Sequence, residues 1–93
     1  MTPETVVWVF VGAGARLPSG AFSTLERAEA WIQQHRLSGL LTAYPLDEGS
    51  YDWAVARGHF EPNTDAKRTP EFIGQFSSGH VTHHHYEGGA RSA

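Results

Sequence analysis

The chain of 93 residues contains no cysteine. It can therefore form neither a disulfide framework nor a thiolate metal site, and nothing in it calls for an oxidising compartment. Its longest run of β-branched and aromatic residues, Val6 to Val11, is far shorter than the roughly 20 residues that a membrane-spanning helix needs. The first fifteen residues also lack the basic leader of a secretory signal. We therefore expect a soluble cytoplasmic protein that does not contact membranes.

Basic charge is scarce as well. Seven Lys and Arg residues stand against ten Asp and Glu residues, which gives a formal net charge of −3. The basic residues are scattered, and only Lys67 and Arg68 are adjacent. Because nucleic-acid binding needs a clustered basic face, the sequence argues against a nucleic-acid partner.

The composition is otherwise that of an ordinary folded protein, with 40% hydrophobic and 18% charged residues. A chain of this length forms one domain, so we expect a single α+β domain over residues 1–93. The ordered part should run from about 5 to 87, with residues 88–93 as a flexible tail. Trp8, Trp31 and Trp53 are expected in the core, one on the first strand and one on each helix.

Apolar periodicity and turn residues predict the element order β-β-α-β-α-β-β. The sheet should be one mainly antiparallel layer with the helices largely on one face. The first strand is a continuous apolar run, which is typical of a central strand covered on both faces. The predicted strands cover 6–11, 16–22, 40–44, 72–76 and 81–87, and the predicted helices cover 24–35 and 51–57.

Local signals support several of these boundaries. Ser23-Thr-Leu-Glu26 has the spacing of a capping box, so Ser23 is predicted to begin the first helix. Ser50 is predicted to cap the second helix. Residues 61–70 contain two prolines and mostly polar side chains, and so should form a solvated loop. Ser77-Ser-Gly79 is expected as a hairpin turn between the last two strands.

Five stretches of the sequence carry a resemblance to known proteins: VWVFVG, PSGAFSTLERAEAWI, LTAYPLDEGSYDWAVARGHF, FIGQFSS and HHHYEGG. They resemble a family of small uncharacterised bacterial proteins, over about residues 6 to 88. The resemblance implies no activity, because none is assigned to that family, and no catalytic residue can be carried over. It does imply that the histidine-rich ending is native, since relatives end in a similar His-Tyr-Glu pattern.

The segment HVTHHHY contains four of the six histidines, His80, His83, His84 and His85. Imidazole is a good ligand for Zn, Ni or Cu, so these residues are candidate metal ligands. In an extended strand, however, His83 and His85 point to one face, whereas His80 and His84 point to the other. A metal site would then need a distant ligand such as His59 or Asp47. The alternative interpretation is a polar strand at a sheet edge, which discourages edge-to-edge pairing.

A second candidate site combines carboxylates with aromatic rings. Its members are Tyr44, Asp47, Glu48, Tyr51 and Asp52. The spacing does not match an EF-hand loop. A turn at Asp47 and a helix start near Asp52 account for the acidic residues structurally. We nevertheless expect this group to form an acidic-aromatic surface for a protein partner.

No pattern in the chain indicates catalysis or a cofactor. The Gly-x-Ser-x-Gly element of a nucleophilic serine is absent, and Gly12-Ala-Gly14 lacks the third glycine and the helix of a dinucleotide loop. We therefore expect a non-enzymatic protein-binding module without a cofactor, of the kind seen in immunity proteins, antitoxins and adaptors; this is an analogy. Pairing of the C-terminal edge strand with a second copy is another possible interaction. The alternative is a metal-binding protein or metal-dependent enzyme that uses the histidine cluster.

Overall fold

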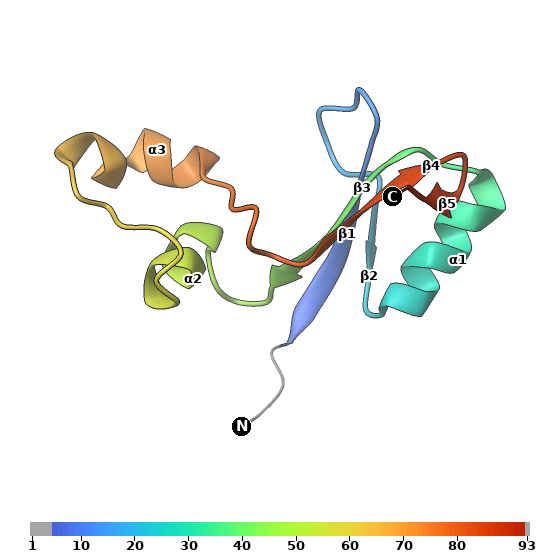
Figure 1. The fold of residues 1–93 in the computed structure, drawn as a ribbon, viewed down its shortest axis with the longest axis horizontal. Coiled ribbons are helices and arrows are strands. Elements are labelled where there is room, and N and C mark those ends of the chain that lie inside the picture. The colour runs from blue at the N-terminus through green and yellow to red at the C-terminus, as the bar shows by residue number, and fades with distance from the viewer. Residues whose placement is uncertain (1–4, 93) are drawn as a thin grey trace. The chain divides into compact units, whose positions relative to one another are not determined.

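The computed structural model describes residues 5–92 of the chain. These residues belong to two compact units. The first unit holds the chain up to Leu46 together with the chain from Val81 onward, and it contains the sheet and one helix. The second unit, Asp47–His80, contains the other helices (Figure 1). The predicted α+β class, with one antiparallel sheet, is confirmed.

The sheet has five antiparallel strands in the order β2-β1-β3-β4-β5. The apolar run that begins at Val6 forms the long strand β1, which lies between β2 and β3 as the sequence predicts for a central strand. It pairs with β3 over its whole length, from Val6 opposite Pro45 to Gly12 opposite Gly39. The strands are β1 (Val6–Gly12), β2 (Gly20–Phe22), β3 (Gly39–Pro45), β4 (His83–Glu87) and β5 (Ala90–Arg91).

Helix α1 (Leu25–His35) packs on one face of this sheet and buries Ala28 and Ile32 completely. Their partners in the core are Phe10, Leu41 and Tyr86, one residue from each of β1, β3 and β4. Removal of these apolar side chains from water is the main contribution to the stability of the unit.

The start of α1 corrects one prediction. The N-cap is Thr24 rather than Ser23, since the Thr24 side-chain oxygen accepts a hydrogen bond from the backbone N–H of Arg27 at 3.2 Å. The helix therefore begins one residue later than the capping-box pattern suggested. Either hydroxyl can perform the capping role, and the chain uses the one whose extended backbone directly precedes the first turn.

The C-terminal residues differ from the predicted flexible tail. Gly88 and Gly89 both have positive φ, at 59° and 93°, and they turn the chain back so that β5 pairs with β4. A Cβ atom on Gly89 would lie 3.0 Å from Cα of Arg36, so this turn also requires a residue without a side chain. Strand β4 is consequently not the last strand, because β5 pairs alongside its last two residues, Tyr86 and Glu87.

The second unit corrects the prediction of a strand over 72–76. Its elements are α2 (Ser50–Ala56), the short 3₁₀ helix η1 (Asp65–Arg68) and α3 (Pro70–Gln75). Helix α3 forms because Thr69 caps it, Pro70 occupies the first turn and Glu71 follows near the positive end of the helix. The predicted hairpin around Ser77 is absent for the same reason, since its first strand is a helix. At α2 the cap is Gly49, without a side-chain hydrogen bond, rather than Ser50.

Within the described residues, no helix has the length and apolar character needed to cross a membrane.

Candidate functional site

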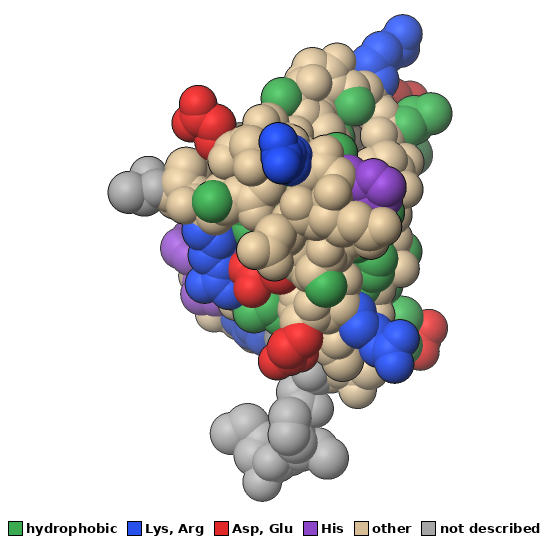
Figure 2. Space-filling model, turned by 90° about the vertical axis from the view of Figure 1, so that its right-hand side faces the viewer, with side chains coloured by type: hydrophobic (Ala, Val, Ile, Leu, Met, Phe, Trp, Pro, Cys, Tyr) green, Lys and Arg blue, Asp and Glu red, His purple; other side chains and the backbone are tan. Residues whose placement is uncertain are grey.

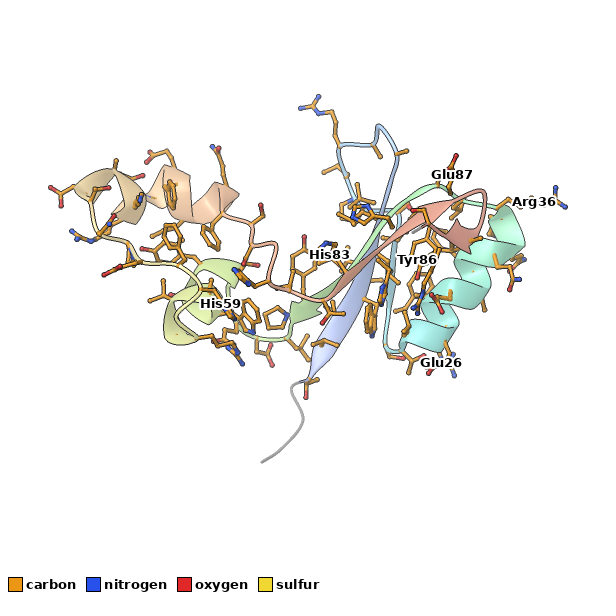
Figure 3. The ribbon with its side chains drawn as sticks, in the orientation of Figure 1. Glu26, Arg36, His59, His83, Tyr86 and Glu87 are labelled. Atoms are coloured by element: carbon orange, nitrogen blue, oxygen red, sulfur yellow. The ribbon has the colours of Figure 1, made fainter. Side chains whose placement is uncertain are left out.

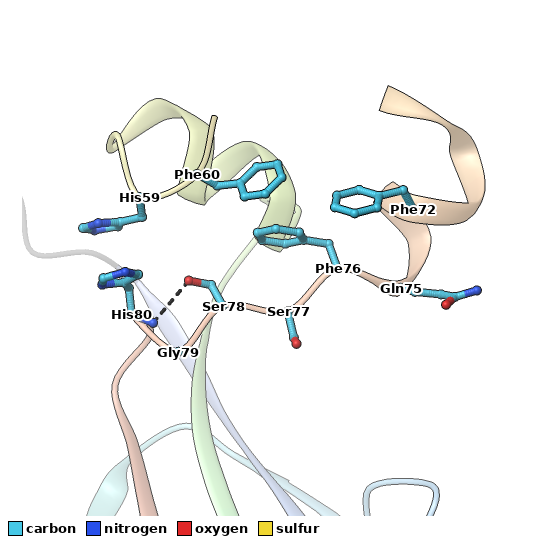
Figure 4. A pocket seen from close by; sticks show the side chains of 9 residues that line it. All are labelled: His59, Phe60, Phe72, Gln75, Phe76, Ser77, Ser78, Gly79 and His80. Carbon is cyan, nitrogen blue, oxygen red and sulfur yellow. Dashed lines mark hydrogen bonds between the residues drawn. The ribbon is translucent and has the colours of Figure 1, made fainter. Parts of the chain in front are cut away.

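The second unit contains a hollow of about 520 Å³ (Figure 4). Three phenylalanine rings line it, from Phe60, Phe72 and Phe76, and two histidines form part of its wall. All three phenylalanines are half-buried, so part of each ring remains accessible. The remaining lining residues are small or polar: Gln75, Ser77, Ser78 and Gly79.

The phenylalanine rings come together because of the helix geometry. Phe72 in α3 and Phe76 at its C-cap are four residues apart and therefore lie on one side of the helix. Phe60, in the loop after α2, contacts both, with ring centroids 5.6 Å from Phe72 and 4.8 Å from Phe76. Tyr51 of α2 adds a fourth ring, edge-on to Phe76 at 5.6 Å, and its hydroxyl donates to the carbonyl oxygen of Lys67 at 3.0 Å. We call these four residues the aromatic cluster.

A stacked pair of histidines closes one side of the hollow. The rings of His59 and His80 are nearly parallel, at 7°, and their centroids are 4.2 Å apart. The ring of Trp53 also contacts His59, with their centroids 5.4 Å apart. The hydroxyl of Ser78 accepts from the backbone N–H of His80 at 3.2 Å, which holds the end of the segment in place. Both histidines are exposed, so this wall is accessible to a partner.

The second unit is also the acidic part of the chain. Residues 47–80 contain six carboxylates and three basic side chains, so their formal charge of −3 equals that of the whole protein. Arg57 lies 3.8 Å from Glu48, and Arg68 lies 2.9 Å from Asp65. The other four carboxylates are exposed and form no ion pair with any described residue: Asp47, Asp52, Glu61 and Glu71.

The five residues of the predicted acidic-aromatic surface are distributed over both units. Tyr44 lies on β3 in the first unit, half-buried and opposite Val7. The other four lie at the start of the second unit, where Asp47, Glu48 and Asp52 are exposed. Tyr51 belongs to the aromatic cluster and its hydroxyl is bonded to backbone, so its polar end is engaged within the unit. The acidic members are thus accessible. The sequence does not predict that the phenylalanines of the same unit line a hollow.

The histidines of β4 divide between the two faces of the sheet, as the strand periodicity predicts. His83 and His85 are exposed on one face, with ring centroids 5.5 Å apart. His84 lies on the face that carries α1 and stacks on Trp8 at 6.0 Å and 9°. His80 belongs to the second unit. Across residues 5–92, no group of three or more His, Asp or Glu side chains is placed to hold a metal ion.

Burial lowers the proton affinity of His84. Because the ring is partly enclosed against Trp8, desolvation lowers the pKa of His84 below its ordinary value, and the nearby Arg91 guanidinium lowers it further. A neutral imidazole is therefore favoured at this position, and it serves as a packing partner of the tryptophan.

A polar network of Glu29, Tyr86 and Arg91 was not predicted from the sequence. The Tyr86 hydroxyl donates to Oε2 of Glu29 at 2.5 Å, and Nε of Arg91 donates to the same oxygen. The bond to Arg91, with that to Tyr86, holds the pKa of Glu29 below its ordinary value despite partial burial. Burial and the bond to Glu29 raise the pKa of Tyr86 to about 12. Figure 3 shows Tyr86 directed from β4 toward α1, where this network ties the C-terminal hairpin to the helix.

The charged side chains on the face drawn in Figure 2 alternate in sign. Lysine and arginine lie beside aspartate and glutamate there, and neither sign forms a continuous field. The excess of negative charge is therefore a property of residues 47–80 rather than of this face.

The comparisons with known proteins show the family of the chain. It belongs to the family described as "Domain of unknown function (DUF7710)", whose model matches residues 7–92. No curated protein and no solved structure matches it.

Proposed function

We propose that this member of the DUF7710 family is a small, non-enzymatic protein-binding module of the cytoplasm, and that its contact surface is the acidic second unit. One observation supports this proposal above the others: residues 47–80 hold the entire net charge of −3 beside an accessible hollow lined by phenylalanine. Complementary charge steers a partner toward a surface, while aromatic side chains supply contact area at the centre of an interface. The partner should therefore be a protein with a basic contact face.

The lining of the hollow supports binding rather than catalysis. A serine nucleophile needs its hydroxyl within hydrogen-bond reach of a base that takes up the proton. Among the described serines, no hydroxyl is bonded to an imidazole nitrogen, and Ser78 uses its oxygen to accept from backbone. The hollow itself contains no carboxylate.

Self-association through a sheet edge receives less support. The two edge strands, β2 and β5, contain three and two residues, and β5 pairs only with Tyr86 and Glu87, so the first residues of β4 also lie at this edge. Edges this short offer few backbone groups for pairing with a second copy. The second unit therefore remains the better candidate for an interaction surface.

The proposal is tested by reversing charge in the second unit. Partners captured from native lysate by wild-type protein should be lost when Asp47→Lys and Glu48→Lys are combined, and capture should weaken as the ionic strength rises. The matched control is Glu26→Lys with Glu87→Lys, which changes the net charge equally through two exposed carboxylates of the first unit. Capture that survives the first pair of changes, or is lost equally with the control pair, would contradict the proposal.

A second candidate function is metal binding through His83 and His85. The observation that favours it is the exposure of both rings on one face, 5.5 Å apart. Titration with Zn²⁺ or Ni²⁺ should then perturb the imidazole resonances of both residues, and His83→Ala should abolish the effect. The control is His84→Gln. Because the ring of His84 stacks on Trp8 on the other face of β4, this substitution should leave metal binding unchanged. Equal losses from both substitutions would exclude the pair as the binding site.

A further inference from the structure

Building on the proposed function, we infer that the hollow of the second unit is an anchor pocket for one aromatic side chain of the partner, on a segment with flanking lysine or arginine residues. The size of the hollow, the chemistry of its walls and the nearby carboxylates without ion-pair partners all favour such an occupant.

The size and shape of the hollow fit a side chain that enters from outside. A volume of about 520 Å³ is within the range of pockets that hold small organic groups. Its lining comes from α3, from the segment of residues 77–80 and from His59 and Phe60 after α2, as Figure 4 shows. A side chain attached to another chain can enter such an open hollow while its backbone stays outside.

The walls favour an aromatic occupant. Phe60, Phe72 and Phe76 contact one another in edge-to-face and offset geometries, and each ring remains half-buried. An inserted aromatic ring can extend this pattern, and such contacts are worth more than the buried area alone. The stacked imidazoles of His59 and His80 add a flat wall on one side.

The rim of the hollow can hold the backbone next to the anchor. Ser77, Ser78 and Gly79 lie outside helices and strands, at the edge of the hollow. Among the described residues, none accepts a hydrogen bond from the backbone N–H of Ser77 or Gly79. A partner segment in an extended conformation can supply the missing carbonyl groups.

The carboxylates select the residues around the anchor. Glu61 follows Phe60 and Glu71 precedes Phe72, so an exposed acid is adjacent in sequence to two of the three rings. Neither acid has an ion-pair partner among the described residues. One cation lies close by, since Nζ of Lys67 is 5.7 Å from the centroid of the Phe60 ring, but neither Glu61 nor Glu71 pairs with it. Lysine or arginine on either side of the anchor would therefore meet an excess of negative charge, whereas acidic neighbours would be repelled.

The test uses two peptides, acetyl-GKKFKKG-amide and acetyl-GKKAKKG-amide, titrated into the full chain and followed by ¹H–¹⁵N NMR. The phenylalanine peptide should shift the amide resonances of residues 76–79 and bind about tenfold more tightly than the alanine peptide, as expected for an aromatic anchor. Equal binding of the two peptides, or shifts confined to residues outside the hollow, would overturn the inference.

Two glycines provide a matched pair of variants. A Cβ atom on Gly79 or on Gly74 meets no heavy atom within 4 Å, and neither glycine has a positive φ, so both accept a side chain. Only Gly79 lines the hollow. Gly79→Leu should obstruct the hollow and lower the affinity for the phenylalanine peptide about tenfold. Gly74→Leu on α3 should leave that affinity unchanged. A larger loss of affinity in Gly74→Leu than in Gly79→Leu would overturn the inference.

These outcomes separate the anchor pocket from the broader proposal. If both peptides bind equally and the charge reversal still abolishes partner capture, the acidic surface stands and the anchor pocket is rejected. If the charge reversal has no effect on capture while the phenylalanine peptide still occupies the hollow, the pocket stands and the acidic contact surface is rejected.

Discussion

Two residues of the first unit, Glu29 and His84, contribute to the loss of its stability in acid. The pKa of each is lower in the folded protein than its ordinary value, 4.5 for the glutamate and 6.5 for the histidine. The unfolded chain therefore binds a proton more readily than the folded chain at both positions. The stability that each group contributes is fully present above its pKa in the unfolded chain and is lost as the pH falls through its pKa in the folded chain. The contribution of His84 therefore decreases below pH 6.5, and that of Glu29 decreases below pH 4.5.

Replacing His84 by phenylalanine should remove the first of these two acid effects. The substitution His84→Phe keeps an aromatic ring against Trp8 but cannot bind a proton. We expect the free energy of unfolding of the wild type to decrease as the pH falls from about 7 to 5, and that of the variant to decrease less, because the wild-type unfolded state gains a proton at this site more readily than the folded state. Urea unfolding followed by circular dichroism at both pH values measures the difference.

The control for this experiment is His85→Phe, on the opposite face of β4. It places the same apolar ring on β4 without the contact to Trp8, so it measures the effect of the substitution itself. Identical pH dependence of wild type and His84→Phe would show that the stacked imidazole does not resist protonation.

At the level of elements, α3 is a helix in a segment whose sequence predicts a strand. Residues 72–76 were predicted as a strand from their apolar character, although Thr69, Pro70 and Glu71 form a typical helix start. A helix of six residues gives too short a window for periodicity to distinguish the two states. The cap favours the helix because the Thr69 hydroxyl accepts a hydrogen bond from the backbone N–H of Phe72. In a strand, that N–H group would need a partner on a neighbouring strand.

The substitution Thr69→Ala should therefore weaken α3. The Thr69 hydroxyl accepts from the backbone N–H of Phe72 at 3.2 Å, and loss of an N-cap costs about 1 kcal/mol. Thr64→Ala is a matched control, since Thr64 precedes η1 without a side-chain capping bond. We expect faster amide hydrogen exchange at Ile73 and Gly74 in the first variant only. Equal exchange rates in the two variants would contradict a capping role for Thr69.

At the scale of the whole molecule, the distribution of charge follows from the sequence together with the division of the chain into two units. The excess of three negative charges is visible in the composition, but its assignment to residues 47–80 depends on where the chain divides. The same applies to the predicted surface of Tyr44, Asp47, Glu48, Tyr51 and Asp52. Its acidic members are exposed as expected, but its two tyrosines belong to different units.

The features that the sequence by itself determined are local ones. The absence of thiols and the net charge follow directly from composition, and β1, α1 and β3 were predicted because apolar runs, a capping hydroxyl and terminal glycines act over a few residues. These signals do not depend on what the rest of the chain does.

Tertiary structure alone decided which distant side chains meet. Glu29 and Arg91 are 62 residues apart, and the loop residue Phe60 contacts the rings of Phe72 and Phe76, which α3 places on one side. No spacing in the sequence encodes such contacts, because they depend on how packed elements place side chains in three dimensions. The Glu29 network and the phenylalanine-lined hollow are therefore properties of the folded units, and both could be recognised only from the structure.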